Sequence, residues 1–128
     1  MSNRQLCDVC VVGGGYSGTM VCANLVRLGY RGTIVLVERG PWAARGVAYN
    51  PPSERLLLNV PAANMGAWAD DPSEFHRWLV GRGREVAPGA FVSRAWYGEY
   101  LEQKLREAVD ASDGRLSVVR GEAVSYSR

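Results

Sequence analysis

The chain has 128 residues, of which 47% are hydrophobic and 22% charged, and its formal net charge at pH 7 is +2. This composition suits one globular domain and excludes a disordered chain. The small, dispersed charge gives no reason to expect nucleic acid or a membrane as a partner, and no apolar stretch is long enough to span a bilayer. Because no signal peptide is visible and there are three cysteines, we expect a cytoplasmic, reducing environment.

The segment from Leu6 to Val12 is almost wholly apolar, which predicts a parallel strand covered on both faces. Cys7 and Cys10 lie within it at the spacing of a redox or zinc motif. Because residues i and i+3 of a strand point to opposite faces, we expect these thiols to be unable to meet. We therefore interpret both as small apolar strand residues.

A glycine-rich turn follows the first strand, then a predicted helix from Ser17 to Leu28 and a second strand from Thr33 to Glu38. An apolar strand, Gly-x-Gly-x-x-Gly, a helix and a strand ending in an acid are the fingerprint of a dinucleotide-binding β-α-β unit. Gly13 permits the tight turn. Gly15 lets the backbone approach a pyrophosphate, and Gly18 lets the helix lie close to the strand.

The neighbours of these glycines are further candidate contacts. Gly14, like Gly15, is expected to let the backbone approach the pyrophosphate closely. Tyr16 and Ser17 offer backbone N–H groups to a phosphate. The Ser17 hydroxyl either binds a phosphate oxygen or caps the helix. Glu38 is placed to accept hydrogen bonds from both ribose hydroxyls and to repel a 2′-phosphate. Arg39 either lies over the adenine or beside the phosphates, or is solvated.

At helical spacing, one face of the predicted first helix is mostly apolar, and we expect that face to pack on the sheet. Its members are Met20, Val21, Asn24, Leu25 and Leu28. From Arg39 to Ala69 no periodicity is evident, although many apolar side chains there need burial, so we expect an ordered excursion over the ligand site. Asn59 is its favoured polar candidate to face a ligand, since a buried amide needs partners; capping the backbone is the alternative.

The remaining segments alternate between predicted helices and strands. Asp71 followed by a proline predicts a helix start, with the helix running to about Val80. The other predicted elements are a short strand from Arg55 to Val60, a helix from Ser93 or Ala95 to about Ala111, a strand from Leu116 to Val119 and another from Glu122 to Tyr126. The spacing of the residues suggests no metal site, and catalytic residues cannot be named.

Four segments of the chain resemble bacterial FAD/NAD(P)-binding flavoproteins with two dinucleotide sites. They are Gly13 to Gly18 with Glu38, Arg45 to Tyr49, Leu57 to Ala62, and Phe75 to Leu79 followed by Arg94 to Leu101. The resemblance implies that the fingerprint holds the ADP half of FAD, and that NAD(P)H is the second substrate of the full-length protein. It also implies that the backbone at Ala123 and Val124 meets the adenine edge. The polar candidates of the excursion to face a flavin are Arg45, Tyr49 and Asn59, and Asn59 is the favoured one.

We therefore expect residues 1–128 to form an N-terminal Rossmann-like α/β domain. Its parallel sheet would be incomplete, it would carry a helical insertion, and a missing C-terminal segment or a partner chain would complete it. The implied function is the FAD-binding portion of an oxidoreductase, either a monooxygenase or an NAD(P)H-linked dehydrogenase or reductase. The small-molecule substrate is unknown, and this chain alone is not expected to be active. An NAD-binding dehydrogenase or S-adenosylmethionine-binding methyltransferase domain, and a truncated non-catalytic nucleotide-binding module, stay open as alternatives.

Overall fold

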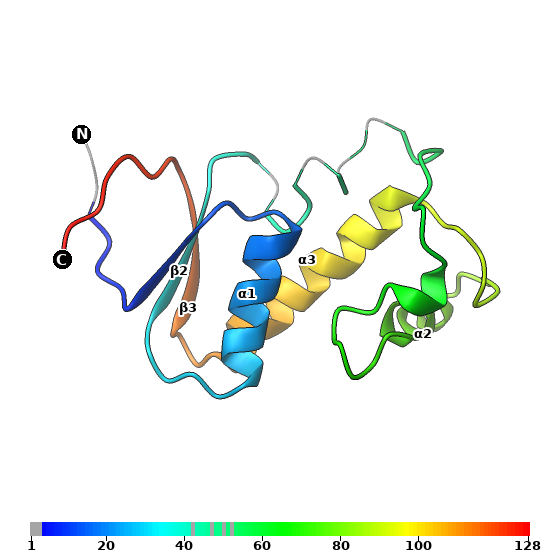
Figure 1. Ribbon diagram of the computed structural model, residues 1–128, viewed down its shortest axis with the longest axis horizontal. Helices are drawn as coiled ribbons and strands as arrows, with labels where there is room; N and C mark the ends of the chain where they lie inside the picture. Colours follow the sequence, from blue (N-terminus) through cyan, green and yellow to red (C-terminus); the bar gives the residue numbers. More distant parts are fainter. Residues whose placement is uncertain (1–3, 42, 47, 50, 52) are drawn as a thin grey trace. The chain divides into compact units, whose positions relative to one another are not determined.

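The computed structural model describes residues 4–41, 43–46, 48–49, 51 and 53–128. The elements in chain order are β1 (Val9–Val12), α1 (Tyr16–Arg27), β2 (Ile34–Glu38), η1 (Ala62–Asn64), α2 (Glu74–Gly81), α3 (Arg94–Ala111) and β3 (Leu116–Arg120) (Figure 1). The chain divides into two compact units, and the boundary between them falls within α3. The first unit is Met1–Gly46 with Glu102–Arg128, and the second is Val47–Leu101.

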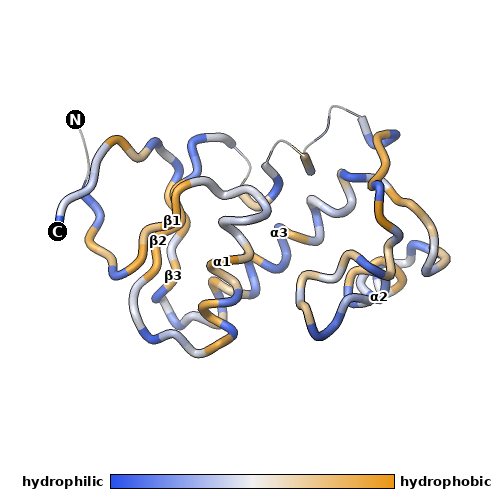
Figure 2. Tube along the Cα trace, in the orientation of Figure 1, coloured by the Kyte–Doolittle hydropathy of each residue, from blue (hydrophilic) through white to orange (hydrophobic). Residues whose placement is uncertain are grey.

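The first unit is built on a three-stranded parallel sheet in the order β1-β2-β3. Val9 pairs with Ile34, which in turn pairs with Leu116, so these three side chains share one face. Ile34 and Leu116 are almost completely buried there. The hydrophobic colouring of β1 and β2 in Figure 2 reflects the apolar composition expected of parallel strands. The predicted α/β fold with a parallel Rossmann-like sheet is confirmed.

Helix α1 packs on β1 and β2 through a different face from the one that the apolar pattern predicts. Its buried residues are Thr19, Met20, Cys22 and Ala23, whereas Val21 is 49% and Leu28 83% exposed. The reason is the close approach at Gly18, where an added Cβ would lie 1.9 Å from the Gly13 carbonyl oxygen. The side of the helix that carries Gly18 therefore faces the strand, and small side chains such as Cys22, one turn later, follow it.

Three predicted strands differ from the observed ones. β1 begins at Val9 rather than Leu6 because the chain bends at Asp8. Around Leu57 there is only an isolated antiparallel bridge to Ser93. Residues 122–128 have no regular secondary structure, so the strand predicted from Glu122 to Tyr126 is wrong. The alternating pattern of that segment has no neighbouring strand to pair with in the described part of the chain, and a strand exists only through such pairing.

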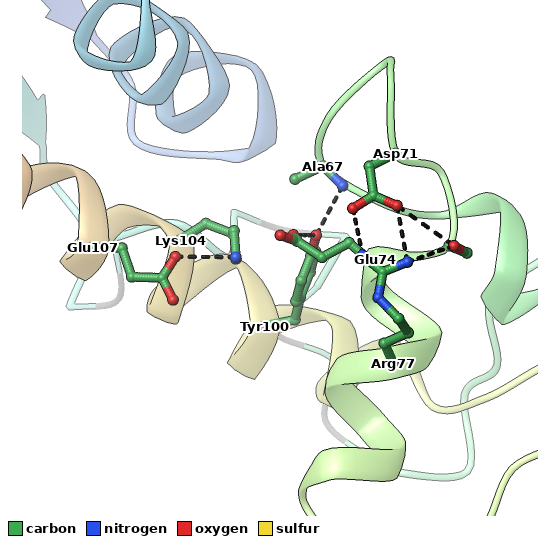
Figure 3. A network of polar contacts seen from close by, with 8 residues as sticks. Ala67, Asp71, Glu74, Arg77, Tyr100, Lys104 and Glu107 are labelled. Carbon is green, nitrogen blue, oxygen red and sulfur yellow. Dashed lines mark hydrogen bonds and ion pairs between the residues drawn. The ribbon is translucent and has the colours of Figure 1, made fainter.

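The second unit contains a cluster of aromatic side chains. Figure 3 shows the polar contacts made by Tyr100, one member of the cluster, and by its neighbours. Phe75 and Tyr100 are completely buried, and their ring centroids lie 5.1 Å apart. The Tyr100 hydroxyl accepts a hydrogen bond of 2.8 Å from the Ala67 N–H and donates to the Glu74 carboxylate. Burial and the bond to Glu74 raise the pKa of Tyr100, so the phenol keeps its proton and its role as donor.

Helix α2 begins at Glu74 with Ser73 as its N-cap, not at Asp71 as predicted. The Asp71 side chain is instead bonded to Arg77, whose Nη1 lies 2.9 Å from Asp71 Oδ1. The backbone of this stretch forms a turn in which the Asp71 N–H donates to the carbonyl oxygen of Trp68. An N-cap needs a side chain that is free to accept a hydrogen bond from the first turn of the helix. Because Asp71 is bonded elsewhere, it does not serve as the N-cap, and the helix begins at Glu74.

Candidate dinucleotide site

The glycine turn after β1 is fixed to the end of β2. The Gly13 N–H donates to Val37 O at 2.8 Å, and the φ of Gly13 is +96°, a conformation that favours glycine. The Gly14 N–H donates to Glu38 Oε2 at 3.0 Å, and a Cβ on Gly14 would lie 3.2 Å from the Glu38 Cβ. Gly14 thus has a specific role, since it lets the acid at the end of β2 lie against the turn.

Helix α1 starts at Tyr16, directly after this turn, with Gly15 as its N-cap. No side chain in the described part of the chain caps its first turn by a hydrogen bond, and that turn holds no acidic residue. The backbone N–H groups of this first turn and the positive end of the helix dipole therefore face the glycine turn. Tyr16 and Ser17 are both exposed there. The arrangement suits a phosphate group.

A pocket of about 230 Å³ opens at the carboxyl ends of the three strands. It is lined by Val12, Gly13, Val37, Glu38, Arg39, Gly121, Glu122 and Ala123. The Gly121 N–H donates to Glu38 O at 2.9 Å, which holds the segment after β3 beside the acid. Pockets for drug-sized ligands have volumes of about 300–1,000 Å³, so this one is of the right order for a nucleoside rather than a whole dinucleotide. Ligands of open α/β sheets bind at this edge.

The structure thus brings together most of the residues that the sequence singled out, with Glu38 and Arg39 lining the pocket and the glycines beside it. Val124 does not line the pocket and is 78% exposed, whereas its neighbour Ala123 is a lining residue. Asn59 belongs to the second unit and its side chain is exposed, so the burial that would require partners for the amide is not found. Its contact with a ligand stays a prediction.

The sequence did not predict that the segment Ala44–Gly46 is hydrogen-bonded to the glycine turn and packs closely against it. The Ala44 N–H donates to Gly14 O at 2.6 Å, and a Cβ on Gly46 would lie 3.1 Å from the Gly15 Cα. Arg45 holds the segment from outside, because its Nε and Nη2 donate to the two carboxylate oxygens of Glu102 at 2.6 and 3.3 Å. Arg45 was one of three polar candidates to face the flavin, and this two-bond pair with α3 gives it a role in positioning the segment.

We predict that Glu102→Gln lowers the affinity of the turn for a dinucleotide by about three- to tenfold, because hydrogen bonds to charged groups contribute about 1.5–3 kcal/mol and this pair is partly solvated. A fluorescence titration of each variant measures the effect. Asp110→Asn, an exposed change on the same helix, is the control and should leave the affinity unchanged. Exchanging the two charges in Arg45→Glu/Glu102→Arg should restore part of the loss. An unchanged affinity in Glu102→Gln would show that the pair does not position the turn.

In the described part of the chain no cluster of three or more His, Cys, Asp or Glu side chains could hold a metal ion. None of the described helices combines the length and apolar character that a membrane span requires.

A comparison with curated protein sequences gave no significant match. Among solved structures, THI4 of Thermovibrio ammonificans is similar with a TM-score of 0.52 and 24% identity, over 90% of this chain and 38% of that one. The myxobacterial chondrochloren halogenase CndH, a variant of FAD-dependent halogenases, gives a TM-score of 0.47 and 15% identity over 90% of this chain and 28% of that one.

The likeness to THI4 shows a shared fold, and this chain spans well under half the length of that protein. The sequence model of the FAD-NAD(P)-binding family matches residues 10–128, which is nearly the whole chain and includes both the glycine turn and the pocket. The chain therefore belongs to the FAD-NAD(P)-binding family.

Proposed function

We propose that this chain is the FAD-binding portion of a flavin-dependent oxidoreductase, and that the pocket at the strand ends takes the adenosine half of FAD. The observation that carries the proposal is the state of the Glu38 carboxylate. Its Oε2 is bonded to the Gly14 N–H, while Oε1 has no hydrogen-bond partner among the described residues. A half-buried carboxylate oxygen at the edge of a nucleoside-sized pocket is matched to a ribose hydroxyl donor.

In this proposal, different residues of the first unit contact different parts of FAD. Glu38 accepts from the ribose and, by its charge, disfavours a 2′-phosphate, which selects FAD or NAD over NADP. The first turn of α1 faces the pyrophosphate. Gly15 and Gly46 pack closely against each other there, since a Cβ on Gly46 would lie 3.1 Å from the Gly15 Cα. Arg39, on the pocket wall, offers a planar cation to the adenine or to a phosphate. Redox chemistry would be supplied by the isoalloxazine ring of bound FAD.

The proposal also includes the reaction. In the full-length protein we infer that NAD(P)H is the reductant and that a small molecule is the substrate, with a hydroxylation or a simple dehydrogenation as the outcome. The support is the family to which residues 10–128 belong. In this proposal the described residues of the first unit bind and orient the nucleotide, and no catalytic step is assigned to them.

The proposal is tested by titrating the purified chain with FAD and, separately, with NAD⁺, while following flavin absorption and protein fluorescence. We expect FAD to bind more tightly than NAD⁺. In Glu38→Gln the affinity should fall about 10- to 100-fold, because a charge-assisted hydrogen bond of about 1.5–3 kcal/mol is lost. Glu85→Gln, at an exposed acid of the second unit, should bind FAD as the wild type does. Preferred binding of NAD⁺ would favour the dehydrogenase alternative, and no binding of either would contradict the proposal.

A further inference from the structure

The bend at Asp8 changes the relation between the two cysteines on either side of it. The N–H groups of Asp8 and Val9 both donate to the Thr33 carbonyl oxygen, at 3.1 and 3.0 Å. In a regular strand consecutive N–H groups point to opposite edges, so two consecutive donors on one acceptor mark an extra residue, as in a β-bulge. An extra residue reverses the alternation of side chains. Cys7 and Cys10, which a regular strand would separate, are therefore brought to one face.

The side chain of Asp8 stabilises this bend. Its Oδ2 accepts hydrogen bonds from the N–H and the hydroxyl of Thr33, at 2.8 and 3.1 Å. The Asp8 N–H also lies 3.0 Å from the Thr33 Oγ1. With the backbone bonds to the Thr33 carbonyl, this set fixes the chain between the two cysteines, so the juxtaposition is a property of the fold rather than of a loose terminus.

The two thiols differ in exposure. Cys7 is half-buried and Cys10 is exposed, and neither is in a disulfide. Burial and the adjacent Cys10 thiol raise the pKa of Cys7, with a further contribution from the charge of Asp8. Such an influence of one thiol on another requires that they be neighbours. The expectation that the two thiols cannot meet assumed a regular strand through both cysteines, whereas the regular strand begins only at Val9.

We propose that Cys7 and Cys10 form a dithiol that closes reversibly to a disulfide by exchange with a small-molecule disulfide such as oxidised glutathione. The exposed Cys10, as the thiolate, attacks one glutathione sulfur, so that the glutathione S–S bond breaks and one glutathione thiolate leaves. Cys7, once deprotonated, then attacks the Cys10 sulfur of the mixed disulfide and displaces the second glutathione. The protein loses two protons and two electrons, and two molecules of reduced glutathione gain them.

The test is to equilibrate the chain with glutathione buffers of graded redox ratio, trap free thiols by alkylation and map the modified peptides by mass spectrometry. We expect an oxidised form with a Cys7–Cys10 disulfide and one free thiol, that of Cys22. Cys22 is an internal standard, because it is completely buried and burial raises its pKa to about 11. Cys7→Ser should leave Cys10 as a stable mixed disulfide with glutathione.

Variants of Asp8 connect the reaction to the bulge. In Asp8→Ala the equilibrium constant for closing the disulfide should fall at least about tenfold, because the thiols are no longer held on one face. Asp8→Asn keeps an acceptor for Thr33 and should lose less. Wild-type protein that yields only mixed disulfides or no oxidised form would overturn the proposal, as would an Asp8→Ala variant that closes as readily as the wild type. Circular dichroism of each variant confirms that it is folded.

Discussion

Gly18→Ala should be among the most damaging single substitutions in the chain. The added Cβ would lie 1.9 Å from Gly13 O and 3.1 Å from the Gly13 carbonyl carbon, so it meets backbone that cannot move aside as a flexible side chain would. Helix α1 must therefore shift away from β1. Overpacking of this kind costs about 1–3 kcal/mol or more, against which alanine returns up to about 1 kcal/mol of helix propensity. We expect a net loss of about 2 kcal/mol in the free energy of unfolding, measured by urea denaturation.

The same shift also moves the first turn of α1 relative to the glycine turn, so FAD affinity should fall by at least about tenfold in protein that remains folded. Gly81→Ala is the matched control, since Gly81 is the last residue of α2 and a Cβ there would meet nothing within 4 Å. It should be neutral or slightly stabilising. A Gly18→Ala variant with unchanged stability would mean that α1 lies farther from β1 than the structure has it.

The geometry of the candidate site was predictable because its determinants are local and ordered along the chain. A strand, a glycine turn, a helix and a strand ending in Glu38 each leave a pattern within a few residues, and the fold places their ends together. The partner of Arg45 was not predictable in this way. Glu102 lies far along the chain on a helix with several acids, and nothing local distinguishes it from the others.

The errors in the prediction have a common physical origin. Apolar periodicity assumes that larger hydrophobic side chains face the sheet, but at α1 the contact distance is set by Gly18, and small residues are buried instead of Leu28. The strand pattern likewise assumes unbroken alternation. At Asp8 a side chain that binds Thr33 bends the chain, so the regular strand begins at Val9 and its alternation does not extend to Cys7. In both cases a specific polar or steric contact overrides the average pattern.

Phe75→Ala should cause the largest loss of stability in the second unit. The side chain is completely buried, and its ring lies 4.9 Å from that of Tyr97, edge to face, and 5.1 Å from that of Tyr100. Truncation removes these contacts and leaves a cavity beside the buried Tyr100 hydroxyl and its bonds. Replacing a buried phenylalanine with alanine costs about 3–5 kcal/mol, and we expect a loss of that size in the free energy of unfolding.

The control is a substitution of Phe91, the other of the two phenylalanines in the chain, which is 51% exposed. Phe91→Ala should change the free energy of unfolding by less than about 1 kcal/mol, since little of its area is withdrawn from water. Phe75→Leu, which keeps most of the volume but no ring, should fall between the two. Equal losses in Phe75→Ala and Phe91→Ala would mean that the aromatic cluster is not the core of this unit. A small loss in Phe75→Leu beside a large one in Phe75→Ala would assign the stabilisation to filled volume rather than to ring geometry.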